Sequence, residues 1–211
     1  MKSHLRSAVF LASACLLTAC SSLLPSPPPT PTFYALSNTA KTTPQDQTVK
    51  AVGPTLLVNV MRAAPGFDSA HMVYTRSPQQ LEHFARNEWA DTPARMLAPW
   101  LVQVLSSELT RSATVGAVLL APSSATSEFA LDSELIRLQQ DFSVQPSRVR
   151  ITLRVALIQT TTRRVLAVRE FDATEPAASD DPRGGVQAAQ VVAGRVLQEV
   201  AEFCRTALRA P

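Results

Sequence analysis

Glycine, histidine and lysine are scarce in this chain, and their scarcity excludes several classes of function. Only 6 of the 211 residues are glycine, and none of these forms the glycine-rich loop that cradles a phosphate group. His71 and His83 lie twelve residues apart with no cysteine or further histidine at ligand spacing, so the sequence predicts no metal site. No Gly-x-Ser-x-Gly motif is present to raise a nucleophilic serine on a sharp turn. The sequence therefore predicts a protein that is not an enzyme and holds no cofactor.

The chain also lacks a dominant charge, which argues against nucleic acid as a partner. The formal net charge is +3, from 20 lysine and arginine residues against 17 aspartate and glutamate residues. Lys2 and Arg6 belong to the N-terminal segment, and without that segment 18 basic residues face 17 acidic ones, a net charge of +1. No cluster of basic and aromatic residues marks one face. We therefore expect no nucleic-acid binding, and we expect docking to partners to depend only weakly on salt.

The three cysteines have different settings. Cys15 lies inside the apolar N-terminal run, Cys20 follows that run, and Cys204 stands alone near the C-terminus. An unpaired cysteine is either a reactive thiol that pairs between chains or a buried small hydrophobe. Cys204 follows Leu197 and Val200 at helical spacing, which favours the buried position.

The N-terminal segment has the layout of a secretory signal peptide. An apolar run over residues 8–17 follows a basic start, and it is shorter than the roughly 20 apolar residues of a bilayer span. Leu17-Thr18-Ala19-Cys20 closes this run and resembles a bacterial lipobox. The resemblance implies that residues 1–19 are removed, that the Cys20 sulfur carries a diacylglycerol and that the new amine receives an acyl chain such as palmitate. The alternative is an ordinary signal peptide followed by a chance cysteine.

A proline-rich tether is expected over residues 20–32. Five prolines in the twelve residues 21–32 exclude a helix or a central strand and favour extended polyproline II. At about 3.1 Å per residue, this spacer would hold the folded part roughly 35 Å from the membrane. Ser21, rather than aspartate, follows Cys20, which resembles the sorting signal of Gram-negative outer-membrane lipoproteins. We therefore expect a lipid anchor on the periplasmic face of the outer membrane.

Residues 33–211 are expected to form one domain, whose elements follow from the hydrophobic pattern. Strands are predicted at 32–36, 55–61, 71–74, 115–120, 129–138, 149–157 and 165–171, helices at 91–112 and 185–209, and loops at 37–54 and 177–185. Residues 77–89 are expected to be irregular or one loose helical turn. The pattern slips near Leu135, which predicts a bulge, and the polar residues 160–163 predict a hairpin. The economical arrangement is an α/β (α+β) fold: a single mixed, mostly antiparallel sheet with two long helices packed on one face.

Short motifs along this domain together resemble one known family. The stretches that carry the resemblance are Phe33–Leu36, Leu57–Val60, Pro65–Asp68, Met72–Tyr74, Glu88–Asp91 and Pro93–Leu97. They are similar to the ABC-type transport auxiliary lipoprotein family, which includes membrane-integrity lipoproteins of the paraquat-inducible protein C type. Asn87-Glu88-Trp89 matches the Asn-x-Trp stretch of that family, whereas Thr75 separates Tyr74 from Arg76 where the family has a Tyr-Arg pair. The resemblance covers nearly all of the domain.

The resemblance implies a function through binding. Lipoproteins of this family accompany an ABC ATPase, a permease and an MCE-domain protein in systems that move lipids between the two membranes. These three proteins, and a second copy of the chain, are therefore the expected partners. One alternative is a lipoprotein that scaffolds or activates a cell-envelope enzyme such as a cell-wall synthase. Another is a lipid hydrolase, which would require a serine or aspartate beside one of the histidines in a concave pocket.

The expected docking region is the segment 65–89, which combines large apolar side chains with little predicted regular structure. The segment holds Phe67, Met72, Tyr74, Phe84 and Trp89. Long loops in compact domains are often functional, and aromatic residues are enriched at interfaces. Phe67, Tyr74 and Trp89 are therefore the candidate partner-binding residues. The alternative is that these side chains fold back onto the core, with Trp89 packed beneath the helix that follows it.

Overall fold

The computed structural model describes residues 30–37 and 52–209, which form a mixed α/β domain and confirm the predicted fold class. Its strands are β1 (Thr32–Tyr34), β2 (Thr55–Val58), β3 (Arg62–Ala63), β4 (His71–Ser77), β5 (Gln80–Trp89), β6 (Ala117–Leu120), β7 (Phe129–Asp141), β8 (Arg148–Gln159) and β9 (Arg164–Pro176). Its helices are α2 (Pro93–Leu105), which continues into the π-helical turn η1 (Ser106–Thr110), and α3 (Pro182–Arg209). The predicted signal peptide, Cys20, most of the tether and most of the predicted loop 37–54 lie outside the described residues.

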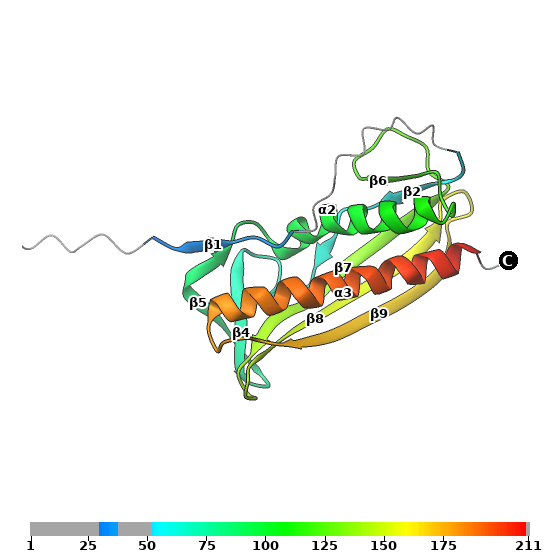
Figure 1. The fold of residues 1–211 in the computed structure, drawn as a ribbon. Coiled ribbons are helices and arrows are strands. Elements are labelled where there is room, and N and C mark those ends of the chain that lie inside the picture. The colour runs from blue at the N-terminus through cyan, green and yellow to red at the C-terminus, as the bar shows by residue number, and fades with distance from the viewer. Residues whose placement is uncertain (1–29, 38–51, 210–211) are drawn as a thin grey trace, which may run out of the picture. The chain divides into compact units, whose positions relative to one another are not determined.

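The sheet is built around β7 (Figure 1). One edge of β7 pairs with β8, and β8 with β9, in two long antiparallel ladders that short turns connect. The other edge pairs in parallel with β2, β3 and β4, one after another along its length. The antiparallel hairpin β4–β5 extends the sheet at one end, and β1 lies parallel to β5. Strands β2 and β6 pair in parallel. Parallel neighbours need a long connection, and the chain between these two strands includes α2.

Two local predictions in the long strands are confirmed. The register of β7 against β8 shifts between Leu135 and Arg137, which is the predicted bulge. The shift leaves both Leu135 and Leu138 buried although they lie three residues apart. Residues 160–163 turn β8 into β9, with Arg163 in the left-handed region at φ 56°.

The two helices lie on the same face of the sheet (Figure 1), as the sequence predicts. Helix α2 buries Leu97, Leu101 and Leu105 at helical spacing, and helix α3 buries Val196 and Leu197. Full burial of such a side chain stabilises the fold by about 1.5–3 kcal/mol relative to exposure. The core therefore fills the layer between the helices and β7, β8 and β9.

Three predicted segments differ from the structure. The predicted loop 177–185 ends early, because α3 begins at Pro182. Within residues 77–89, predicted to be irregular or one loose helical turn, Gln80–Trp89 form the long strand β5. Their side chains are mostly exposed or half-buried and polar, so the strand has no apolar alternation to reveal it, and its pairing with β4 and β1 provides the order. The predicted strand 55–61 ends at Val58, and residues 59–61 separate β2 from β3.

Candidate functional site

Three aromatic rings gather at the free end of the β4–β5 hairpin, and we call them the distal aromatic cluster. Tyr74 comes from β4, Phe84 from β5, and Phe142 directly follows β7. The ring centre of Tyr74 lies 4.5 Å from that of Phe84 and 5.6 Å from that of Phe142. All three side chains are half-buried. The cluster therefore presents aromatic surface to solvent while its rings hold one another in place.

A polar network covers one side of this cluster. The Tyr74 hydroxyl donates a hydrogen bond to Glu82 Oε2 over 3.0 Å, and Arg76 Nε donates to Glu82 Oε1 over 2.9 Å. The Arg76 guanidinium also lies 5.7 Å from the centre of the Tyr74 ring. The bond from Arg76 lowers the pKa of Glu82, and the bond to Glu82 raises the pKa of Tyr74. A neutral tyrosine, a carboxylate and a guanidinium thus hold one another at the hairpin surface.

The spacing of Tyr74 and Arg76 along β4 explains this arrangement. Residues i and i+2 of a strand share a face, so Arg76 lies on the face of Tyr74. Thr75 points the other way, is buried, and donates its hydroxyl toward the backbone carbonyls of Ser77 and Gln80 across the turn. The i, i+2 spacing of Tyr74 and Arg76 therefore brings the two side chains together.

The structure separates the three predicted partner-binding residues. Tyr74 is half-buried in the distal aromatic cluster, whereas Phe67 and Trp89 are buried in the domain. Trp89 packs with the core, as the alternative interpretation held. The sequence alone predicts no site role for Arg76, Glu82 or Phe142. Phe142 joins the cluster through the parallel pairing of β4 with β7, which no local pattern reveals.

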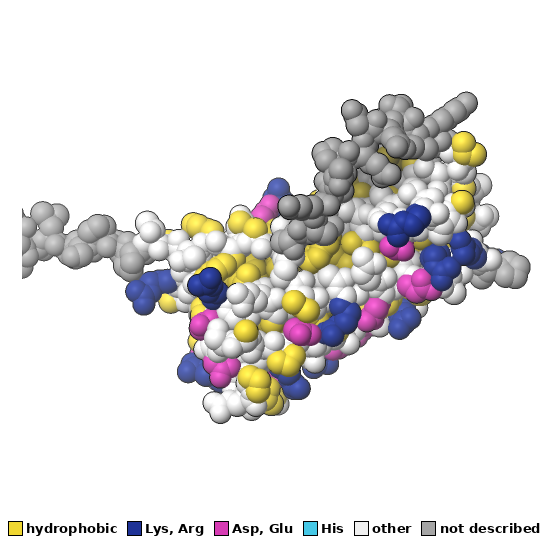
Figure 2. Space-filling model, viewed as in Figure 1, with side chains coloured by type: hydrophobic (Ala, Val, Ile, Leu, Met, Phe, Trp, Pro, Cys, Tyr) yellow, Lys and Arg dark blue, Asp and Glu magenta, His cyan; other side chains and the backbone are white. Residues whose placement is uncertain are grey.

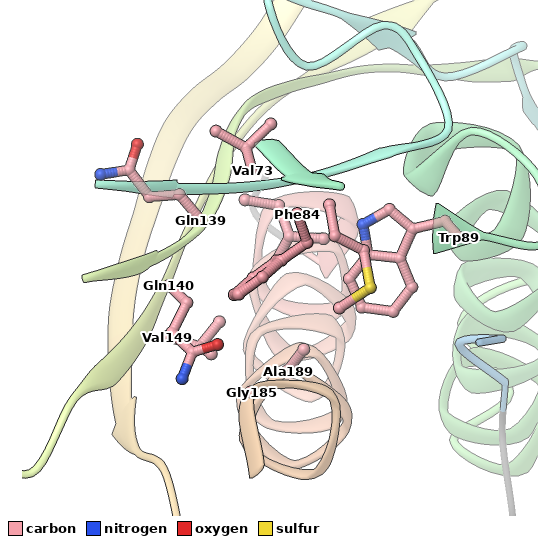
Figure 3. A pocket seen from close by; sticks show the side chains of 10 residues that line it. Val73, Phe84, Trp89, Gln139, Gln140, Val149, Gly185 and Ala189 are labelled. Carbon is pink, nitrogen blue, oxygen red and sulfur yellow. The ribbon is translucent and has the colours of Figure 1, made fainter. Parts of the chain in front are cut away.

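Trp89 and Phe84 line a small interior cavity beneath the hairpin (Figure 3). Gly185 and Ala189 of α3 close it on the opposite side. Its volume of about 10 Å³ has room for one water molecule at most, far below the roughly 300 Å³ of a small ligand pocket. The cavity is therefore a small gap in the packing and has no room for a substrate.

Buried Gln140 lies at one side of this cavity. Its Nε2 donates to Ser147 Oγ over 2.9 Å and to the Asp181 carbonyl over 3.3 Å. Its Oε1 accepts no hydrogen bond from the described residues. That oxygen points at Gly185, where a Cβ atom would lie only 2.1 Å away. The Gln140 amide fits at this position because Gly185 has no side chain.

A larger, open groove of about 170 Å³ lies beside α2. Its lining is mostly apolar, with one charged side chain, Arg95. The exposed side chains of Val60 and Leu120 form part of one wall. Among the described residues that line the groove, no acid, base or nucleophile lies beside a second one.

The structure brings His71 and His83 together, although the sequence places them twelve residues apart. They stand on opposite strands of the β4–β5 hairpin, and their ring centres are 5.0 Å apart. Both side chains are exposed. Within residues 30–37 and 52–209 there is no cluster of three or more histidine, cysteine or carboxylate side chains that could enclose a metal ion.

Cys204 is buried and makes no disulfide among the described residues. Burial raises the pKa of its thiol to about 12, so the group stays protonated at neutral pH. A protonated, buried thiol is a poor nucleophile. Cys204 therefore acts as a small core residue, which is the position that its helical spacing favours.

The chain matches one family model, and solved structures share its fold. The sequence model of the ABC-type transport auxiliary lipoprotein component matches residues 34–201. A crystal structure of a Xanthomonas campestris protein of family DUF330 has 23% identity and a TM-score of 0.66, covering 84% of this chain and 94% of that one. The crystal structure of an uncharacterized protein has 17% identity and a TM-score of 0.64, covering 83% and 99%. No curated protein matches the chain.

Neither α2 nor α3 combines the length with the apolar character that a bilayer span requires, and the same holds for every helix in the described part of the chain.

Proposed function

The chain belongs to the ABC-type transport auxiliary lipoprotein family, and we propose that it serves such a system as a membrane-anchored, non-enzymatic subunit that acts by binding other proteins. The observation that carries this proposal is the family match, which spans almost all of the described domain. The more specific role is lipid transport between the two membranes, beside an ABC ATPase, a permease and an MCE-domain protein. The distal aromatic cluster supports it as a surface fit for docking.

The proposed anchor is Cys20 at the outer membrane. The lipobox-like Leu17-Thr18-Ala19-Cys20 and the prolines after it support this assignment, and strand β1 begins directly behind them at Thr32. Two lipid signals already give stable anchoring, so three acyl chains would hold the domain firmly. Intact-mass analysis of the membrane-extracted protein is expected to show a chain that starts at Cys20 and carries acyl mass. A chain that starts elsewhere without acyl mass would contradict the anchor.

The proposed docking surface is the distal aromatic cluster with Arg76. Tyr74 offers an aromatic ring with a polar edge, and tyrosine and arginine are enriched among the residues that dominate binding energy. Buried Phe67 and Trp89 would act from beneath, by holding the hairpin and the chain before it in position. The partner proposed for this surface is the MCE-domain protein. Because the charge of the anchored chain is close to zero, salt is expected to change this affinity only weakly.

Site-specific photocrosslinking in living cells tests this surface. A photoreactive amino acid at position 74 or 142 is expected to capture the MCE-domain protein of the same system. The same probe at Val168, an exposed residue of β9 with 58% of its surface accessible, serves as the matched control and is expected to capture nothing specific. Capture from Val168 alone would move the interface to β9. Capture of a cell-wall enzyme from position 74 would favour the scaffold function instead.

A substitution series complements the crosslinks. Tyr74→Ala is expected to weaken co-purification of the partner by removing ring contacts worth about 2 kcal/mol or more at an interface centre, which is roughly thirtyfold. Tyr74→Phe keeps the ring and removes only the bond to Glu82, so it is expected to retain most of the binding. Equal binding by the wild type and Tyr74→Ala, with the fold intact by circular dichroism, would contradict the assignment.

A further inference from the structure

The two exposed histidines of the hairpin form a pair with a defined geometry. His71 begins β4, and His83 lies in the middle of β5 opposite Val73. Their ring centres are 5.0 Å apart and their planes are tilted by 47°. Because the rings come from two strands and not from one flexible loop, their separation follows from the pairing of the backbone.

The backbone around the pair is held on several sides. The amide of Trp89 donates to the carbonyl of Ala70 over 2.8 Å, directly before His71. Strand β5 continues its pairing to β1, and β4 continues to β7 at Tyr74. The two imidazoles therefore extend from strands that are anchored within the sheet, and little ordering is needed to bring them together.

The separation of the rings matches two imidazoles that share one metal ion. A metal–imidazole bond is about 2.0–2.1 Å long and the bonded nitrogen lies about 1.1 Å from its ring centre, so each ring centre would lie about 3.2 Å from the ion. At bond angles of about 90–109°, two such ring centres are about 4.5–5.2 Å apart. The observed 5.0 Å falls within this range.

We propose that His71 and His83 form a two-imidazole site for a borderline divalent transition metal, with Cu²⁺ bound most tightly and Ni²⁺ and Zn²⁺ next. Neutral imidazole is a preferred ligand of all three ions, and Cu²⁺ stands highest in the affinity order for a given set of nitrogen ligands. The described residues supply no third ligand in a ready-made cluster. The remaining coordination positions are therefore open to water or to a donor on another molecule. The site is separate from the proposed docking surface and does not depend on that function.

The test is a Cu²⁺ titration of the untagged full-length protein in detergent, since an affinity tag of histidines would mask the site. Calorimetry is expected to show one Cu²⁺ per chain. Electron paramagnetic resonance is expected to show two coordinated nitrogens at that site. His71→Ala and His83→Ala are each expected to weaken the affinity for Cu²⁺ by at least about tenfold. Loss of a residue that only hydrogen-bonds a metal ligand already costs about tenfold or more, and each of these variants removes a ligand itself.

Control variants keep the result interpretable. Gln80→Ala changes an exposed side chain of the same strand and is expected to bind Cu²⁺ like the wild type. The double variant His71→Ala/His83→Ala measures the Cu²⁺ binding of the rest of the chain. Because both histidine side chains are exposed, the variants are expected to melt like the wild type without metal. Wild-type affinity in either single variant, or a one-nitrogen spectrum for the wild type, would overturn the proposal.

Discussion

Replacement of Gly185 by alanine is the most sharply defined perturbation of this fold. The added methyl group would lie 2.1 Å from Oε1 and 2.8 Å from Cδ of Gln140, well inside ordinary contact distance. Gln140 is 4% exposed, so its amide cannot swing into water without opening the packing. Relief of the clash therefore breaks the bonds from Gln140 Nε2 to Ser147 and to the Asp181 carbonyl.

The expected magnitude combines three contributions. Overpacking of a buried site costs about 1–3 kcal/mol. A buried amide and hydroxyl left without partners cost about 1–3 kcal/mol. Alanine is favoured over glycine inside a helix by about 1 kcal/mol, which offsets part of this loss. The net result is a destabilisation of about 3 kcal/mol, which corresponds to a melting temperature lower by about 6–12 °C for a domain of this size.

Urea and thermal unfolding of a double-mutant cycle measure this effect. In the background of Gln140→Ala the clash is absent, so Gly185→Ala is expected to be neutral or slightly stabilising, with a coupling energy of about 2 kcal/mol or more. Gly194→Ala is the comparison in the same helix: its methyl group would lie 3.2 Å from the Trp100 ring, a milder crowding than the 2.1 Å at Gly185, so a smaller cost is expected. Equal costs of Gly185→Ala with and without Gln140 would refute the packing described here.

Two further perturbations follow from the pKa shifts. The pKa of about 12 for buried Cys204 predicts that the native protein resists iodoacetamide at pH 8 and is labelled only on unfolding; rapid stoichiometric labelling of native protein would contradict its burial. Arg150 donates hydrogen bonds to Asp172 and thereby lowers the pKa of Asp172 in the folded state. The pair therefore stabilises the fold at pH values above the unfolded pKa of about 3.9. This contribution is lost as the pH falls through the lower pKa of the folded state. The urea midpoint of Asp172→Asn is therefore expected to decline less than that of the wild type between about pH 5 and pH 2, and parallel declines would contradict the assignment.

The long elements of the fold could be predicted because their patterns are local. Strand β8 alternates buried and outward residues, and α2 and α3 repeat buried residues every three or four positions. The bulge in β7 is visible as a slip of the same alternation. These segments bury one side over many residues, so the pattern of the sequence reports their environment directly.

The candidate sites could be predicted only in part because they depend on pairing between distant segments. Tyr74 is identified by its type and neighbourhood, but Phe142 reaches it only through the parallel contact of β4 with β7. The histidine pair could not be predicted for the same reason. His71 and His83 are twelve residues apart in the sequence, and only the pairing of β4 with β5 places their side chains next to each other. Strand β5 itself lacks an apolar pattern, because its outward side chains are polar and exposed. Without that strand, neither cluster can be assembled from the sequence.

The domain presents its distinctive surfaces at separate places. Figure 2 shows hydrophobic side chains mixed with basic and acidic ones over the face that it presents, without a large area of one sign. Cross-strand ion pairs on β8 and β9, such as Arg150 with Asp172 and Arg154 with Glu170, balance charge locally. The proposed docking function would therefore draw its selectivity from shaped apolar features, and in the described part of the chain the distal aromatic cluster provides three rings in mutual contact.

Quantitative mass spectrometry of proteins recovered with this chain from native membranes, after mild crosslinking, tests the proposed function. We predict that the ATPase and permease of one ABC transport system and its MCE-domain protein are enriched together. We also predict that Tyr74→Ala lowers their recovery while the variant remains folded and in the membrane fraction. Recovery of the chain from membranes without any ABC transport component, under conditions that preserve such complexes, would contradict the proposed function.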